Sequence, residues 1–134
     1  ITTAIKAGVG TIVIDSFDEI TRVSDIAKSL NKTQKVYLRL TPGIDAHTHE
    51  FISTAHEDVK FGFSIASGAA NEAIKKCMEQ SSLNLTGIHC HIGSNVFAVD
   101  NFAAASKVMK NTKKYKPAVV KMANYANNFG CKRK

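Results

Sequence analysis

Residues 11–40 decide the fold of this chain, and they read TIVIDSFDEITRVSDIAKSLNKTQKVYLRL. Apolar, mostly β-branched residues over 11–14 and again over 36–40 predict two short buried strands. Between them, over 20–30, apolar residues recur at the spacing of one helix face. A strand, a helix and a second strand joined by short connections predict a parallel β-α-β unit with a right-handed crossover.

Both ends of this helix carry recognisable signals. Ser16 and Glu19 have the spacing of a capping box, in which each side chain satisfies a free backbone N–H of the first turn. Asn31 is a typical stop signal. Upstream, the residues before Gly8 read as the tail of an earlier helix, which predicts that part of a longer protein precedes Ile1.

The alternation of strand and helix continues along the chain. The further predictions are a long polar excursion over 44–66, a helix from Ser67 to about Gln80, a strand over 85–90, a helix capped by Asp100, and a strand beginning within 121–125. The apolar sides of the two helices are predicted at Ala70, Ala73, Ile74 and Cys77, and at Phe102, Ala105, Val108 and Met109. Four strands alternating with helices predict one α/β domain over 1–134. It is either an open doubly wound sheet or about half of a (β/α)8 barrel, since a whole barrel needs roughly 250 residues.

Composition narrows the class of protein. The 134 residues carry a formal charge of +7, partly in late basic clusters, but aromatic residues do not interleave with these charges as a nucleic-acid surface requires. The three cysteines form no CxxC motif, which argues against a disulfide framework and fits a reducing compartment. No apolar run is long enough to span a membrane. We therefore expect a cytoplasmic protein with neither a nucleic-acid nor a membrane partner.

In α/β folds the reactive groups lie at the carboxyl ends of the strands. Arg39 lies near the end of the second predicted strand; its guanidinium could hold a phenolate or a carboxylate, make a structural ion pair, or extend to solvent at a barrel mouth. At the end of the third strand, alternation puts His89 and His91 on the same side. Gly93 then permits close backbone approach and Ser94 offers a hydroxyl to a phosphate. The alternative there is one packed histidine and an ordinary turn.

The polar excursion carries a further group of candidates. His47, His49 and His56, with acidic residues nearby, could form a zinc or iron centre. A metal-dependent hydrolase built on a barrel is therefore an alternative function.

Several stretches of the chain, taken in order, resemble one family. These stretches are VIDSFDEI (13–20), VYLRLTPGIDA (36–46), AHTHEFISTAHEDVKFGFS (46–64) and GIHCHIGSNVF (87–97). They resemble the amino-acid decarboxylases that depend on pyridoxal phosphate, and the HTHEF and HEDVKFGFS segments resemble the diaminopimelate decarboxylase branch. The resemblance is continuous to about Lys110 and patchy afterwards.

The resemblance implies a pyridoxal-phosphate-binding (β/α)8 TIM barrel that works as a homodimer. It implies a carboxy-lyase of lysine biosynthesis, which converts meso-diaminopimelate to L-lysine and CO2. His91 would stack on the pyridine ring, Gly93 and Ser94 would contact the cofactor phosphate, and Arg39 would lie near the phenolic oxygen. Lys60 would be structural, and the histidines of the excursion would not be metal ligands.

The chain departs from the family pattern in two places. The lysine that forms the Schiff base with the cofactor would lie upstream of Ile1, so the chain alone is expected to be inactive. Where the family has a glycine-rich phosphate loop, this chain has Ala126, Asn127 and Asn128, whose side chains would crowd the phosphate. A non-catalytic remnant that docks on a full-length subunit is therefore a second alternative.

Overall fold

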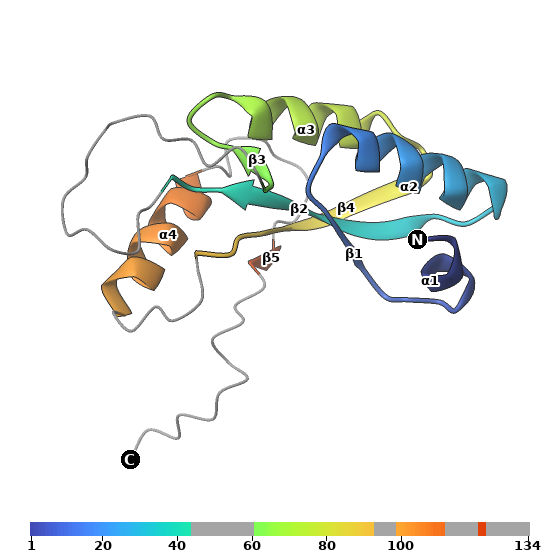
Figure 1. The fold of residues 1–134 in the computed structure, drawn as a ribbon, viewed down its shortest axis with the longest axis horizontal. Helices are drawn as coiled ribbons and strands as arrows, with labels where there is room; N and C mark the ends of the chain where they lie inside the picture. Colours follow the sequence, from blue (N-terminus) through green and yellow to red (C-terminus); the bar gives the residue numbers. More distant parts are fainter. Residues whose placement is uncertain (44–60, 93–98, 112–120, 123–134) are drawn as a thin grey trace, which may run out of the picture.

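The computed structural model describes residues 1–43, 61–92, 99–111 and 121–122, in which helices and strands alternate (Figure 1). The helices are α1 (Thr2–Lys6), α2 (Phe17–Ser29), α3 (Ala69–Met78) and α4 (Val99–Asn111), and the strands are β1 (Ile12–Ile14), β2 (Gln34–Thr41), β3 (Phe63–Ser64), β4 (Leu83–His89) and β5 (Lys121–Met122). The predicted elements are confirmed, with small shifts at their ends. β3, inside the predicted polar excursion, has no counterpart in the sequence-based prediction.

α2 begins and ends where the sequence predicts. The Ser16 hydroxyl accepts the backbone N–H of Glu19 at 3.3 Å, which is one half of the capping box. In a capping box the Glu19 carboxylate would accept the N–H of the cap residue, Ser16. Here it accepts instead the N–H of Asp15, the residue before the cap, at 3.1 Å. At the other end, Asn31 has a left-handed φ of 51°, and its N–H and that of Lys32 bond back to the last turn as a Schellman motif.

The strands are parallel and follow the order β1-β2-β4-β5, with β3 paired beside the end of β2. Along this path each strand is followed by a helix and then by its neighbour in the sheet. A doubly wound sheet reverses its direction at a switch point, whereas steady progression in one direction is typical of a (β/α)8 barrel. The described residues therefore form consecutive β/α units of such a barrel.

The hydrophobic core lies between the sheet and the pair of helices α2 and α3 (Figure 1). Alternate residues of β2 (Val36, Leu38 and Leu40) are buried in this core. The four residues predicted for the apolar side of α3 are all buried there as well: Ala70, Ala73, Ile74 and Cys77. The residues between the buried positions of β2, including Arg39, are half-buried on the other face of the strand. In a closed barrel that face points inward.

Three local predictions are wrong. Ser67 is not the cap residue of α3, because Gly68 occupies that position with a φ of 85°, a conformation that glycine adopts without strain. The Ser67 hydroxyl still accepts the N–H of Ala69, the first residue of the helix, at 3.4 Å. Asp100 lies inside the first turn of α4, since that helix already begins at Val99. Phe102 is 46% exposed, because the described core covers α4 only further along, around Met109.

Candidate functional site

The candidate residues gather at the carboxyl ends of the parallel strands. Asp15 follows β1, Arg39 lies near the end of β2, and His89 is the last residue of β4, with His91 shortly beyond it. Arg39 and His89 are register partners on neighbouring strands, so their side chains lie on the same face of the sheet. The structure thus brings Arg39 together with the histidine segment, as an α/β site requires.

A bulge in β4 decides which side chain lies opposite Arg39. Leu85 pairs with Val36 and Gly87 pairs with the next residue, Tyr37, so Thr86 is an extra residue that has no pairing partner in β2, and the register shifts there by one residue. Without this shift, Ile88 would lie opposite Arg39 and His89 would turn to the core face. With it, Ile88 is buried in the core and His89 faces the candidate site.

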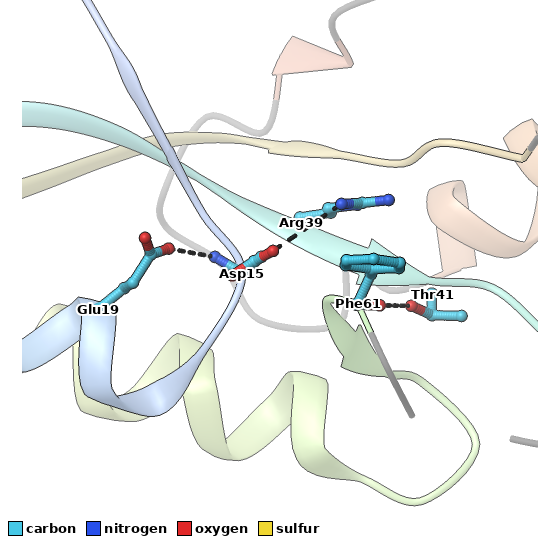
Figure 2. A network of polar contacts seen from close by, with 5 residues as sticks. All are labelled: Asp15, Glu19, Arg39, Thr41 and Phe61. Carbon is cyan, nitrogen blue, oxygen red and sulfur yellow. Dashed lines mark hydrogen bonds and ion pairs between the residues drawn. The ribbon is translucent and has the colours of Figure 1, made fainter. Parts of the chain in front are cut away.

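Arg39 is flanked by an acid on one side and an aromatic ring on the other (Figure 2). Its Nη1 lies 3.8 Å from Oδ2 of Asp15, with side chains 24% and 38% exposed. A half-exposed ion pair of this kind contributes about 0–1 kcal/mol. Its Cζ lies 5.1 Å from the centroid of the Phe61 ring, in a cation–π contact that does not neutralise the charge. The guanidinium can therefore still bind an anionic ligand.

The turn that begins at Phe61 packs directly on Arg39. The carbonyl oxygen of Phe61 accepts the hydroxyl of Thr41 at 2.6 Å, and the next residues pair with the end of β2 as β3. Gly62 has a φ of 76°, and a Cβ atom there would lie 2.7 Å from the carbonyl oxygen of Arg39. A residue with a side chain would have to push the turn away from the strand.

His89 is half-buried beside other basic groups. Burial lowers its pKa from 6.5, and the charges of Arg39 and then of His91 lower the pKa further. The imidazole is therefore neutral near pH 7, and it can both donate and accept a hydrogen bond at the site.

The described cysteines are suited to packing and not to nucleophilic attack. Burial raises the pKa of Cys77 to about 11. Burial also raises the pKa of Cys90, which lies between the two histidines. Both are free thiols.

Several residues of the predicted site lie outside the described residues: Gly93, Ser94, Lys60, Ala126, Asn127, Asn128, His47, His49 and His56. Their roles stay predictions. Within the described ranges, no three His, Cys, Asp or Glu side chains come together as a metal site would require. No helix in that part of the chain has the length and apolar character needed to cross a bilayer.

Sequence reasoning missed three neighbours of Arg39. Asp15 directly follows the buried strand β1, so its position in the sequence already placed it at the same edge of the sheet. Gly62 lies between two aromatic residues, and a glycine in such a place often marks a close approach of backbone. No pattern in the sequence indicated that Gly62 and Phe61 would contact Arg39.

Comparison with known proteins identifies the family. The family model described as pyridoxal-dependent decarboxylase, pyridoxal binding domain, matches residues 1–124. The diaminopimelate decarboxylase of Mycobacterium tuberculosis (strain H37Rv) is 55% identical over 106 residues, which cover 79% of this chain and 24% of that protein. That of Bacillus subtilis (strain 168) is 38% identical over 131 residues, covering 95% of this chain and 30% of that protein.

A solved structure agrees with these matches. The crystal structure of diaminopimelate decarboxylase from M. jannaschii in complex with L-lysine gives a TM-score of 0.73 at 32% identity, covering 83% of this chain and 26% of that one. The chain therefore spans 24–30% of the length of these relatives. The matches give no support to a metal-dependent hydrolase.

The described residues fit the cofactor of this family. Pyridoxal phosphate is an aromatic ring that carries a phosphate and a phenolic oxygen. The site offers the partly exposed side chain of Arg39 and a neutral ring at His89, on the face that a barrel turns inward. This donor set suits an anionic aromatic ligand. By its match over residues 1–124 and its barrel topology, the chain belongs to the pyridoxal-dependent decarboxylases and forms part of their pyridoxal-binding domain.

Proposed function

We propose that this chain is part of the cofactor-binding barrel of a diaminopimelate decarboxylase, which converts meso-diaminopimelate to L-lysine and CO2 in lysine biosynthesis. The observation that carries the proposal is the partly exposed Arg39 beside His89, at the strand edge of a pyridoxal-dependent decarboxylase fold. The names of the relatives at 55% and 38% identity favour the diaminopimelate branch.

The residues of the chain itself bind and orient the cofactor. Arg39 would hold the phenolic oxygen with its planar guanidinium. His91 is exposed just beyond the end of β4 and can lie against a face of the pyridine ring. Gly93 and Ser94 follow it along the chain, and their backbone N–H groups and hydroxyl are suited to the phosphate.

When bound, pyridoxal phosphate would supply an electron sink for the electron pair that is left on carbon when CO2 departs. Arg39 would stabilise negative charge on the phenolic oxygen of the bound cofactor. His89 is neutral near pH 7, so it adds no second cation next to Arg39.

A homodimer and a cytoplasmic location belong to the same proposal. The resemblance of the sequence to the decarboxylases supports both, and the absence of a CxxC motif fits a reducing compartment. Sedimentation of the purified chain at several concentrations measures its association directly.

Titration with pyridoxal phosphate tests the proposed function. The purified chain is titrated with pyridoxal phosphate and with pyridoxal, which lacks the phosphate, while the absorbance of the ligand is followed. We expect saturable binding that requires the phosphate and weakens in Arg39→Ala and Ser94→Ala. Weak, unsaturable imine formation that is equal for both ligands and both variants would mean that surface lysines react, and it would contradict the proposal.

A further inference from the structure

Phe61 lies across Arg39 although the hydrophobic core does not require it there. Its side chain is 48% exposed, so burial alone does not account for an aromatic residue at this position. Its ring nevertheless lies against the guanidinium, with the ring centroid 5.1 Å from Cζ of Arg39 (Figure 2). The contact is directed at one functional group and not at the core.

We infer that Phe61 and Gly62 are positioning residues, which hold the Arg39 guanidinium in the orientation that meets the anionic oxygen of the cofactor. This inference rests on the proposed function and extends it to residues that do not themselves touch the cofactor.

The two neighbours of Arg39 act differently on its charge. An ion pair with Asp15 orients the guanidinium but offsets part of its positive charge. The face of an aromatic ring attracts a cation through its quadrupole and leaves the net charge of the site unchanged. Phe61 can therefore restrict a side chain that is otherwise rich in rotamers without weakening its attraction for an anion.

The turn is anchored on both sides of Gly62. Before the glycine, the hydroxyl of Thr41 donates to the Phe61 carbonyl oxygen at 2.6 Å. After it, Phe63 packs edge-on against Phe17, with ring centroids 5.0 Å apart. Gly62 brings the backbone of the turn against the backbone of Arg39, where a Cβ would be 2.7 Å from the carbonyl oxygen. The ring is thus fixed relative to the strand that carries Arg39.

The first test measures Arg39 in the chain without ligand. The ¹H–¹⁵N signal of Arg39 Nε is assigned by its loss in Arg39→Lys, and its order is measured by the heteronuclear NOE. We expect an ordered Nε in the unsubstituted chain and in Phe61→Tyr, and a mobile one in Phe61→Leu. Phe102→Leu is the matched control, since Phe102 is also an exposed phenylalanine, at 46%. An Arg39 signal that does not respond to Phe61→Leu would overturn the inference.

The second test uses pyridoxine 5′-phosphate, which keeps the phenol and the phosphate but has no aldehyde to react with lysines. Losing the cation–π contact should weaken its binding by about two- to fivefold in Phe61→Leu. The phenol of the bound probe should also ionise at a pH closer to that of the free probe, and Phe61→Tyr should restore both values. A residue that only supports the fold would lower the melting temperature and leave the phenol ionisation unchanged, and that result would overturn the inference.

The two proposals fail in different ways. If the unsubstituted chain shows no saturable binding of the probe, the proposed function is wrong, and the positioning inference falls with it. If the probe binds and Arg39→Ala weakens it, while Phe61→Leu behaves like Phe102→Leu, only the positioning inference is wrong.

Discussion

Replacing Gly62 with alanine should destabilise the fold more than the same replacement at Gly8, although the two glycines have nearly the same φ angle. Their φ angles are 76° and 79°. A side chain in this left-handed region costs roughly 1–2 kcal/mol at either position. At Gly8 a new Cβ would meet nothing within 4 Å, whereas at Gly62 it would lie 2.7 Å from the carbonyl oxygen of Arg39 and 3.2 Å from its carbonyl carbon.

The difference between the two variants therefore isolates the collision with Arg39. The closest atom in the way, at 2.7 Å, belongs to backbone, so the strain cannot be relieved by turning a flexible side chain. Overpacking of this kind typically costs about 1–3 kcal/mol. We expect Gly8→Ala to lose about 1–2 kcal/mol, and Gly62→Ala about 2–5 kcal/mol.

Urea unfolding followed by circular dichroism measures both losses. The slope of the free energy of unfolding against urea should stay the same in the two variants, so that the shift in midpoint reports stability. Equal losses at Gly62 and Gly8 would refute the close approach of the turn to Arg39.

Three further predictions follow from the caps, the histidine and the buried thiol. Ser16→Ala should lose about 1 kcal/mol in urea unfolding, and Ser29→Ala, at the exposed end of the same helix, much less; equal losses would count against the cap. Because the pKa of His89 is lower in the folded state than its ordinary 6.5, its neutral form stabilises the fold above that pH, and this contribution is lost as the pH falls through the folded-state pKa. Unfolding across acidic pH should therefore show a smaller loss of stability in His89→Gln than in the unsubstituted chain, and an unchanged loss would contradict the burial of His89. Cys77, with a pKa raised to about 11, should resist iodoacetamide until urea unfolds the chain, which peptide mass mapping can follow; early labelling would show that it is accessible.

Elements built by local forces could be predicted from the sequence. The limits of α2 depend on Ser16, Glu19 and Asn31, which act within a few residues of themselves. The buried face of α3 follows from the spacing of apolar residues along one helix. Each of these features is encoded in a short window, and the structure confirms each of them.

Features that depend on a distant partner could not be predicted in this way. β3 is a strand only because Phe63 pairs with Leu40, across a long stretch of chain. The exposure of Phe102 depends on how far the core extends along α4, which the periodicity of that helix does not show.

The same distinction between local and distant interactions applies to the candidate site. Arg39 and His91 were predicted because strand ends in α/β folds carry reactive groups. The contacts of Arg39 with Asp15 and Phe61 join segments that are far apart in the sequence, and no local pattern encodes them.

The extra residue in β4 has a consequence at the level of the gene. Because Thr86 is accommodated as a bulge, losing its codon would leave a regular strand in which Leu85 still pairs with Val36 and His89 still lies opposite Arg39. Losing the codon for Ile88 instead would place His89 opposite Leu38, on the side facing the helices. Homologous genes could therefore gain or lose a codon at Thr86 without moving His89 away from Arg39. In an alignment of these sequences, a gap in β4 should be placed at Thr86 and not between Thr86 and His89.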